Sequence, residues 1–227
     1  MVSDHLELTS QLGLDRYHLV GHDWGAAIAM HLARLAPENL ISASVLNTTF
    51  WKMDYLGMWH LWLMNLPLVP TLLFRLAPEW FFAATMRKAF NDPDRLPAAS
   101  RSSYLDMFRD RETTRFWIRL YRQTLRFTLG AALPRSIRMG MGSSGVRLPR
   151  SSASAYQLPI QLVWGVDDKF CPLWVGRAIV GRLRELGTPV ELHEVHDSGH
   201  FVTEEQPLAV AGLVADWLNR RTGSSRS

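Results

Sequence analysis

Cysteine is nearly absent from this 227-residue sequence, because Cys171 is the only one. A single thiol excludes a disulfide within the chain and a metal cluster held by several thiolates. This cysteine usage is typical of a reducing compartment, and we expect a cytoplasmic protein. Residues 1–10 also lack the basic patch and apolar run that a secretory signal needs.

Charge is sparse too, since Asp, Glu, Lys and Arg make up 20% of the chain and give a formal net charge of +4. With 47% hydrophobic residues, this composition is typical of one soluble globular domain rather than a disordered or fibrous chain. The arginines are spread along the sequence instead of lining one element, so we expect no nucleic-acid partner. They gather with Gly and Ser at 135–150 and 220–227, and this predicts two mobile stretches.

An uncharged run extends from Tyr55 to Phe74 and has the length of a membrane-spanning helix. His60, Asn65, Pro67 and Pro70 argue against a span, because they place polar groups and two missing backbone donors inside it. We therefore expect two short apolar helices hinged at the prolines, forming a lid or a pocket wall, and no membrane partner. The alternative, a membrane-associated protein that uses this run, fails if the purified chain stays soluble without detergent.

Helical and strand patterns alternate in the first fifty residues. Leu6, Leu8, Leu12 and Leu14 fit an amphipathic helix that ends at Gly13. The expected elements that follow are an apolar strand at 17–20, a tight turn, a helix at 26–35 and a strand at 41–46. This alternation predicts a parallel sheet with helices packed on its faces.

A helical block then interrupts the strand pattern, because the residues from Asn47 to about Ala155 are aromatic, rich in Met and helix-like. The strand pattern resumes at Ile160, and we expect strands at 160–164 and 190–195 and helices at 173–186 and 208–218. This order predicts an α/β fold, with a mostly parallel sheet, helices on both faces and an inserted helical cap. The expected parts are an N-terminal core segment at 1–48, the cap at 49–155, a C-terminal core segment at 156–220 and a flexible tail at 221–227.

Gly21, Asp23 and Gly25 form a Gly-x-nucleophile-x-Gly pattern between the first strand and the following helix. We expect both glycines to be needed, because a side chain two residues from the nucleophile would clash with the strand or the helix. The turn presents Asp23 at a helix N-terminus, whose partial positive charge favours an anion. A carboxylate needs no base to activate it and attacks saturated carbon to give an alkyl ester. A helix N-cap is the alternative interpretation of Asp23.

Three motifs occur in order along the chain: His-Asp-Trp-Gly at 22–25, Trp-Gly-Val-Asp-Asp at 164–168 and Ser-Gly-His-Phe at 198–201. In these motifs the chain resembles the α/β-hydrolase superfamily, and within it the group of epoxide hydrolases and haloalkane dehalogenases. The resemblance extends from Met1 to the last expected helix. It implies an α/β-hydrolase core with a cap, no cofactor, and the hydrolysis of a small apolar electrophile at carbon.

The resemblance also implies roles for individual residues. Asp23 is the nucleophile, and His200 is the general base that activates water to hydrolyse the ester. Asp168 orients His200, because it stands at the fourth position of Gly-x-x-Asp, and the adjacent Asp167 is the fallback. Trp24 contributes a backbone N–H to the oxyanion hole, and its indole N–H holds a leaving halide or lines the substrate pocket.

These residue types also have roles other than catalysis. Asp168 alone fits a turn or a cap, and a lone histidine after a strand is often structural. His193, His196 and His200 suggest zinc, but the odd spacing of the first two puts them on opposite faces of a strand, so we expect no metal site. Aromatic residues of the cap fit packing better than catalysis. The catalytic roles that packing replaces are proton donation to an opening epoxide for the tyrosines and halide binding for the tryptophans. The tyrosines are Tyr55, Tyr104 and Tyr121, and the tryptophans are Trp51, Trp59, Trp62, Trp80 and Trp117.

One motif of the family is missing, the His-Gly-x-Pro loop that supplies the second oxyanion N–H. The helix at Met1 matches the helix directly before the nucleophile strand, so we expect a core that lacks its N-terminal strands, roughly 60 to 90 residues. The strand at 17–20 then becomes an exposed apolar edge through which the chain could self-associate. Loss of one oxyanion donor typically lowers a rate by about 10² to 10³, so we expect an alkyl ester trapped on Asp23 or no activity.

The sequence therefore predicts a hydrolase of the epoxide hydrolase or haloalkane dehalogenase type. Its partners are water and a small apolar epoxide or alkyl halide, with comparable support for each. A hydrolase of the same group with another substrate is an equally supported alternative. The alternative is a catalytically impaired or non-catalytic hydrolase fragment, from a truncated gene or a wrongly assigned start.

Overall fold

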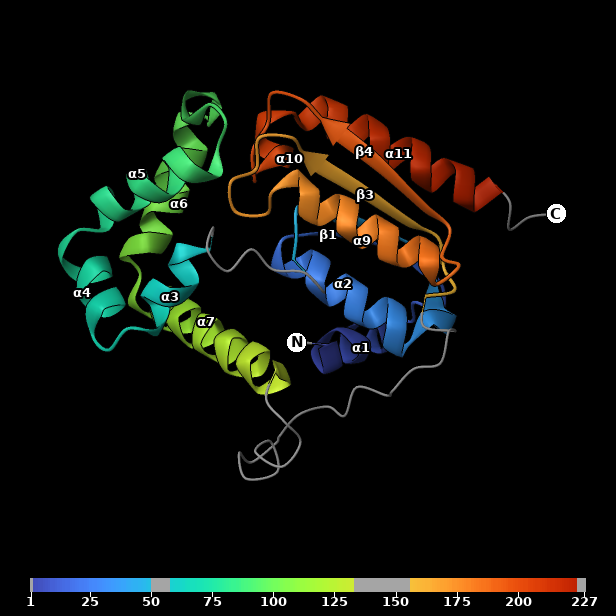
Figure 1. The fold of residues 1–227 in the computed structure, drawn as a ribbon, viewed down its shortest axis with the longest axis horizontal. Coiled ribbons are helices and arrows are strands. Elements are labelled where there is room, and N and C mark those ends of the chain that lie inside the picture. The colour runs from blue at the N-terminus through green and yellow to red at the C-terminus, as the bar shows by residue number, and fades with distance from the viewer. Residues whose placement is uncertain (1, 50–57, 133–155, 224–227) are drawn as a thin grey trace. The chain divides into compact units, whose positions relative to one another are not determined.

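The computed structural model describes residues 2–49, 58–132 and 156–223 (Figure 1). The chain divides into two compact units. Residues 1–54, 88–95 and 151–227 form the core unit, and residues 55–87 and 96–150 form the cap unit. The arginine-rich stretch at 135–150, the last residues 224–227, Trp51 and Tyr55 lie outside the described residues. No helix in the described ranges is long and apolar enough to cross a membrane.

The core unit contains a four-stranded parallel sheet with the strand order β1-β2-β3-β4. The strands are β1 (Tyr17–His22), β2 (Leu40–Leu46), β3 (Ile160–Gly165) and β4 (Val190–Val195). All four coincide with the strands expected from the sequence to within two residues. Every residue of β3 is buried, as expected for a parallel strand that is covered on both faces.

The helices of the core unit cover both faces of this sheet, as predicted (Figure 1). They are α1 (Val2–Gln11), α2 (Trp24–Leu35), α9 (Leu173–Glu185), α10 (Val202–Glu205) and α11 (Pro207–Gly223), with 3-10 turns η1 (Pro37–Asn39) and η2 (Pro93–Arg95). Alternating residues of β3 show which helix lies on which face. Trp164 packs on Gly176 of α9, whereas the Gln161 amide donates to the Leu213 carbonyl of α11 at 3.0 Å. The predicted doubly covered parallel sheet is therefore confirmed.

Two helices of the core unit differ from the sequence prediction. The helix α1 ends at Gln11, so Leu12 and Leu14 lie beyond it. Within α1, Leu6 is partly buried and Leu8 is 52% exposed. At the other end of the chain, α11 continues to Gly223, where a flexible tail was expected from residue 221. Its last turn is stabilised because the Arg221 guanidinium stacks on the Trp217 ring at 4.3 Å.

The cap unit is helical, as expected. It contains α3 (Trp59–Asn65), α4 (Val69–Leu76), most of α5 (Pro78–Ala89), α6 (Ala98–Arg109) and α7 (Arg111–Ala132). The helices α3 and α4 are short and separated at Pro67, so the expected hinged pair is confirmed. Tertiary contacts between aromatic rings fill the interior, such as Phe74 with Phe81 at 5.1 Å and Phe108 with Trp117 at 5.3 Å.

The arginines are not as evenly distributed as the sequence analysis expected. Five of them recur at helical spacing on α7, at positions 111, 115, 119, 122 and 126. Steps of three and four residues place them on one side of the helix. The expectation that arginine lines no single element is therefore wrong, because the helical period is visible only once α7 is recognised as one continuous helix.

The strand β1 forms one edge of the sheet, because β2 is its only partner among the described strands. Its Val20 side chain is 52% exposed. An exposed edge of this kind is a site at which another strand can pair. Self-association through β1 stays a prediction.

Candidate active site

The candidate nucleophile Asp23 stands at the turn between β1 and α2. Its backbone φ is +49°, in the left-handed region that non-glycine residues adopt at a cost of about 1–3 kcal/mol. Two hydrogen bonds hold this conformation. The N–H of Asp23 donates to the Leu46 carbonyl at 3.1 Å, and the Thr48 hydroxyl donates to the Asp23 carbonyl at 2.7 Å. The strained turn is therefore fixed against the end of β2, while the Asp23 side chain remains 38% exposed.

The two glycines that flank Asp23 have different roles. A Cβ at Gly21 would lie 2.5 Å from backbone atoms of Gly25, so any side chain at position 21 would clash with the start of α2. A Cβ at Gly25 would meet no atom of the described residues within 4 Å, and the backbone there does not have a positive φ. The expectation that both glycines are sterically required is correct for Gly21 and wrong for Gly25.

Asp168 lies in the loop that follows β3, and its carboxylate is completely buried. Oδ1 accepts the backbone N–H groups of Phe170 at 2.7 Å and Cys171 at 2.8 Å. Oδ2 accepts the Asn47 amide at 2.7 Å and lies 2.8 Å from His200 Nδ1. Four donors thus compensate for the burial of one charged group and fix its orientation.

Asn47, the residue after β2, links three strand ends. Its Nδ2 donates to Asp168 and, at 3.4 Å, to the carbonyl of Gly199. Its Oδ1 accepts the N–H of Gly165 at 3.1 Å. The residue is fully buried and has a positive φ of 38°, a conformation that asparagine tolerates better than most residues. One side chain therefore ties the end of β2 to the loop of the acid and to the loop of the histidine.

His200 is carried by the loop after β4, which packs directly on neighbouring backbone. Gly165 and Gly199 are in such close contact that a Cβ at position 165 would overlap the Gly199 carbonyl. The N–H of His200 donates to the Ala89 carbonyl at 2.6 Å. On the other side, Nε2 of His22 donates to the His200 carbonyl at 2.7 Å, since a carbonyl oxygen only accepts. The backbone of His200 is thus held at both its N–H and its carbonyl.

Glu205, the last residue of α10, is a buried carboxylate whose hydrogen bonds all go to backbone. Its Oε2 accepts the N–H of Gly199 at 2.6 Å. Its Oε1 accepts the N–H groups of Asn91 at 2.8 Å and Asp92 at 3.0 Å. These three bonds connect the histidine loop to the 88–95 segment within the core unit.

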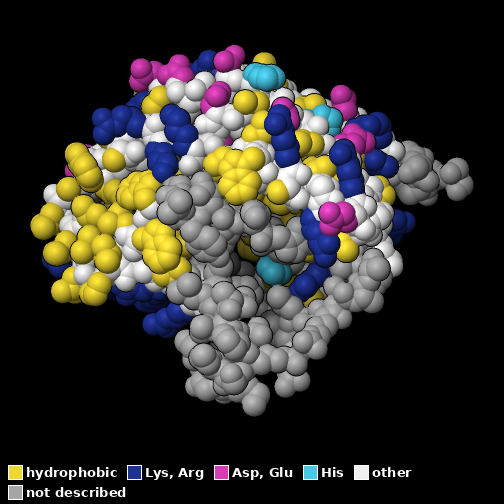
Figure 2. Space-filling view, in the orientation of Figure 1, with side chains coloured by type: hydrophobic (Ala, Val, Ile, Leu, Met, Phe, Trp, Pro, Cys, Tyr) yellow, Lys and Arg dark blue, Asp and Glu magenta, His cyan; other side chains and the backbone are white. Residues whose placement is uncertain are grey.

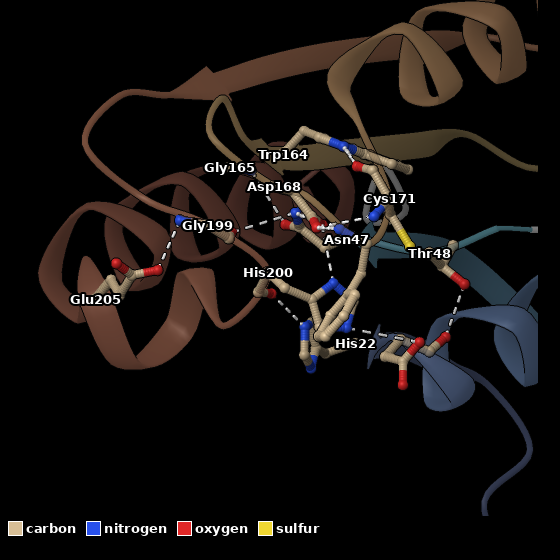
Figure 3. A network of polar contacts seen from close by, with 12 residues as sticks. His22, Asn47, Thr48, Trp164, Gly165, Asp168, Cys171, Gly199, His200 and Glu205 are labelled. Carbon is tan, nitrogen blue, oxygen red and sulfur yellow. Dashed lines mark hydrogen bonds and ion pairs between the residues drawn. The ribbon is translucent and has the colours of Figure 1, made fainter. Parts of the chain in front are cut away.

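The structure brings Asp23, Asp168 and His200 together. Figure 3 shows Asp168 beside His200. Because an ionised carboxylate only accepts, the proton on Nδ1 of His200 points at Asp168, 2.8 Å away. Nε2 faces Asp23 Oδ1 at 3.8 Å, which is longer than a hydrogen bond and short enough for an ion pair. Asp167, the fallback, is exposed, and its N–H donates to the Ser198 carbonyl. The geometry therefore favours Asp168 as the partner of the histidine.

Burial and neighbouring charges shift the pKa values of the two histidines in opposite net directions, up for His200 and down for His22. Burial alone lowers the pKa of His200, but the charge and hydrogen bond of Asp168, with Asp23 and Cys171, raise this pKa well above its ordinary value. The imidazole is thereby stabilised as a cation between two carboxylates. His22 responds oppositely, because burial and then the nearby His200 charge lower its pKa.

A metal is the other chemistry that these groups suggest, since ligand atoms of Asp168, Cys171 and His200 lie within 4.8 Å of one another. The donors fit a metal poorly. Asp168 already accepts four hydrogen bonds. Burial raises the pKa of the Cys171 thiol to about 12, which opposes formation of the thiolate that a metal requires. The arrangement therefore fits a hydrogen-bonded acid and base pair better than a metal centre.

The other predicted residues lie on helices. Trp24 is the first residue of α2 and is partly buried. Tyr104 on α6 and Tyr121 on α7 belong to the cap unit, where the Tyr121 ring packs edge-on against His60 at 5.4 Å. The oxyanion role of Trp24 and the proton-donor role of these tyrosines stay predictions.

Sequence reasoning does not identify Asn47, Thr48 or Glu205. A signal for the first two exists, because polar residues that directly follow a buried parallel strand lie at the sheet edge where sites form. Glu205 carries no such signal, since its backbone partners are near it only in the folded chain.

Residues 2–213 match the model of the Alpha/beta hydrolase family. The chain is 23% identical to AB hydrolase superfamily protein YfhM of Bacillus subtilis, over 96% of this chain and 71% of that protein. It is 26% identical to Haloalkane dehalogenase 2 of Mycobacterium bovis, over 92% of this chain and 67% of that protein. Among solved structures, epoxide hydrolase CorEH superposes with a TM-score of 0.70 at 17% identity, covering 96% of this chain and 73% of that one.

The family match spans the turn that carries Asp23, the loop that carries Asp168 and the loop that carries His200. The fold comparison agrees with it over nearly the whole chain. The chain therefore belongs to the alpha/beta hydrolase family.

Proposed function

We propose that this protein hydrolyses a small apolar epoxide or alkyl halide through an ester of Asp23. The observation that supports this most is the placement of one imidazole between two carboxylates, 2.8 Å from Asp168 and 3.8 Å from Asp23. A base set at this distance from Asp23 suits an attack on an ester of that residue. The nucleophile in this proposal is the carboxylate itself, which needs no deprotonation.

The first step is displacement at saturated carbon. A carboxylate oxygen of Asp23 forms a bond to the substrate carbon, and the bond from that carbon to the halide or epoxide oxygen breaks. A halide leaves as an anion, whereas an opened epoxide keeps its oxygen as an alkoxide that takes up a proton from solvent. The positive φ of Asp23 supports this step, because it presents the carboxylate at the N-terminus of α2.

The second step is attack by water on the carbonyl carbon of the ester. Ester formation removes the negative charge of Asp23, and the pKa of His200 falls because one of the groups that raises it has been neutralised. His200 then releases its proton to solvent and acts as the base. Asp168 stabilises the imidazolium that forms when His200 takes the proton of water. The bond between the Asp23 carbonyl carbon and the substrate oxygen then breaks, His200 returns the proton to that oxygen, and the alcohol and the Asp23 carboxylate are released. The Trp24 N–H is the proposed donor to the ester oxyanion.

The two substrate classes are supported by different relatives. Haloalkane dehalogenase 2 and epoxide hydrolase CorEH are each similar to this chain at low identity. A direct comparison uses 1-bromobutane and 1,2-epoxybutane, which share a carbon skeleton and differ in the leaving group. Release of bromide supports the haloalkane dehalogenase type, and formation of the diol supports the epoxide hydrolase type.

The same assay tests the proposal through variants. We expect Asp23→Asn to abolish product, His200→Gln to stop the reaction at the ester, and Asp167→Asn to leave the rate close to that of the unmodified chain. Product formation that survives Asp23→Asn contradicts the proposal. If a folded chain gives neither product nor ester with either substrate, this result supports the non-catalytic alternative.

A further inference from the structure

The cap unit exposes an unusual amount of apolar side chain on α3, α4 and the start of α5. Figure 2 shows hydrophobic side chains gathered over this part of the cap, with Lys and Arg at its edges. We name the exposed set the cap patch. Its residues are Trp62 (46% exposed), Leu66 (47%), Leu68 (72%), Val69 (37%), Leu72 (49%), Leu76 (78%) and Trp80 (61%).

The cap interior does not account for this patch. The buried face of α4 is already supplied by Pro70 and Phe74, which pack inward. Val69, Leu72 and Leu76 recur at steps of three and four residues and form a second apolar stripe on the same helix. Contiguous exposed apolar surface on this scale marks a site of interaction.

Arginines border the patch. A groove of about 390 Å³ between α4 and α7 is lined by Arg75, Arg111 and Arg115 together with the apolar side chains of Phe74 and Ile118. No acidic side chain in the described ranges pairs with these three arginines. The neighbouring Arg109, in contrast, is neutralised by Glu79 at 2.7 Å.

The net positive charge of the chain is concentrated in the same unit. The cap unit holds thirteen arginines and four acidic residues, whereas the core unit has more acidic than basic residues. Four of these arginines line one side of α7 and are exposed: Arg111, Arg115, Arg119 and Arg126. A surface that combines exposed tryptophan and leucine with unpaired guanidinium groups is complementary to a surface that is apolar inside and anionic outside.

We propose that the cap patch and the arginine-lined groove bind the surface of a bilayer that contains anionic phospholipid. The guanidinium groups of Arg75, Arg111 and Arg115 contact lipid phosphates, and the apolar side chains enter the boundary between headgroups and acyl chains. The helices α3 and α4 have 7 and 8 residues, so they lie in the interface rather than cross it. This mode of binding differs from a membrane-spanning segment, and it departs from the expectation of no membrane partner that was based on the sequence.

Two other occupants fit the surface less well. Nucleic acid would satisfy the arginines but offers no apolar partner for leucines that are more than 70% exposed, Leu68 and Leu76. A second copy of the chain would bring the same unpaired arginines face to face, and like charges in an interface oppose association. An anionic bilayer satisfies both components of the surface.

Co-sedimentation with vesicles tests the proposal on the full chain. We expect binding to phosphatidylcholine vesicles that contain phosphatidylglycerol, little binding to pure phosphatidylcholine, and weaker binding as salt is added. The double variant Leu72→Asp/Leu76→Asp should lower the affinity at least ten-fold. Arg111→Gln/Arg115→Gln should lower it roughly 25-fold, at about five-fold for each arginine removed.

Matched controls come from the core unit. Leu208→Asp changes a leucine that is 87% exposed outside the patch, and Arg182→Gln/Arg184→Gln removes two exposed arginines from α9. Both controls should bind vesicles like the unmodified chain, and circular dichroism checks that every variant is folded. The proposal is overturned if the unmodified chain does not sediment with anionic vesicles at low salt, if the patch variants bind unchanged, or if the controls lose binding equally. It is also overturned in favour of a dimer interface if the unmodified chain is a dimer that does not bind vesicles and Leu72→Asp/Leu76→Asp abolishes this dimer.

Discussion

The carboxylate of Glu205 accepts the backbone N–H of Gly199 at 2.6 Å. Gly199 directly precedes the candidate base, so the orientation of His200 depends on a residue that touches neither Asp23 nor Asp168. The same carboxylate also accepts two N–H groups from the 88–95 segment. That segment in turn supplies the Ala89 carbonyl that holds the His200 N–H. The histidine loop is therefore fixed by a closed set of bonds around one buried side chain.

Glu205→Gln tests this arrangement. The amide has the size of the carboxylate but replaces one acceptor oxygen with a donor, so at least one backbone N–H loses its partner. An unsatisfied buried group costs about 1–3 kcal/mol, and we expect a loss of unfolding free energy in that range together with a lower kcat and little change in KM. Urea unfolding and steady-state kinetics measure the two effects. The control Glu204→Gln makes the same chemical change one residue away, and equal effects of the two variants would remove the special role of Glu205.

Asn47→Ala is expected to weaken the acid and base pair. The variant leaves Asp168 with three donors and deprives the Gly165 N–H of its acceptor. We expect a destabilisation of about 1–3 kcal/mol and at least a ten-fold slower ester hydrolysis, because Asp168 is less firmly oriented. Single-turnover kinetics separate ester formation from ester hydrolysis. Asn39→Ala, in the η1 turn, is the control, and an unchanged hydrolysis rate in Asn47→Ala would contradict this account.

The glycines provide a matched pair of predictions on stability. In Gly165→Ala the new Cβ overlaps the Gly199 carbonyl, and we expect a destabilisation of at least about 2 kcal/mol. In Gly25→Ala the new Cβ meets open space within α2, where alanine is up to about 1 kcal/mol more favourable than glycine. We therefore expect thermal unfolding to give a lower Tm for Gly165→Ala and an unchanged or higher Tm for Gly25→Ala. A large loss of Tm in Gly25→Ala would restore the original expectation that both glycines of the turn are required.

The raised pKa of His200 makes part of the stability depend on pH. A group whose pKa is higher in the folded chain than in the unfolded chain stabilises the fold fully below the unfolded value, about 6.5 for histidine. This stabilisation is lost as the pH rises through the folded value. We expect the difference in unfolding free energy between the unmodified chain and His200→Asn to be largest below about pH 6.5 and to shrink above it. Urea unfolding across this range measures the difference, and a difference that grows with pH would be inconsistent with a stabilised imidazolium.

Much of the fold follows from local sequence patterns. The strands β2 and β3 are short runs of apolar residues, and the tight turn at Asp23 is marked by Gly21, so periodicity and turn chemistry suffice to place them. The leucines of α1 show the limit of this reasoning. The spacing of Leu6, Leu8, Leu12 and Leu14 fits an amphipathic helix, but the helix ends at Gln11 and the last three of these leucines are exposed.

The candidate site is predictable only in part for a related reason. Asp23, Asp168 and His200 each stand in a motif beside a strand, so their proximity follows from the parallel sheet. Glu205 is near its partners only because α10 folds back on the 88–95 segment, which no local pattern indicates. The exposed end of α11 was similarly misjudged, because Arg221 is ordered by stacking on Trp217, one turn away.

The central claim is that Asp23 forms the covalent intermediate, and peptide mapping by mass spectrometry tests it most directly. His200→Gln is incubated with 1-bromobutane and separately with 1,2-epoxybutane, digested and sequenced, with Asp23→Asn as the control. We predict one adduct, on the peptide that contains Asp23, and its absence in the control. The buried Cys171, whose pKa is raised to about 12, should stay unmodified. An adduct on any other residue, or turnover without an adduct on Asp23, would contradict the claim.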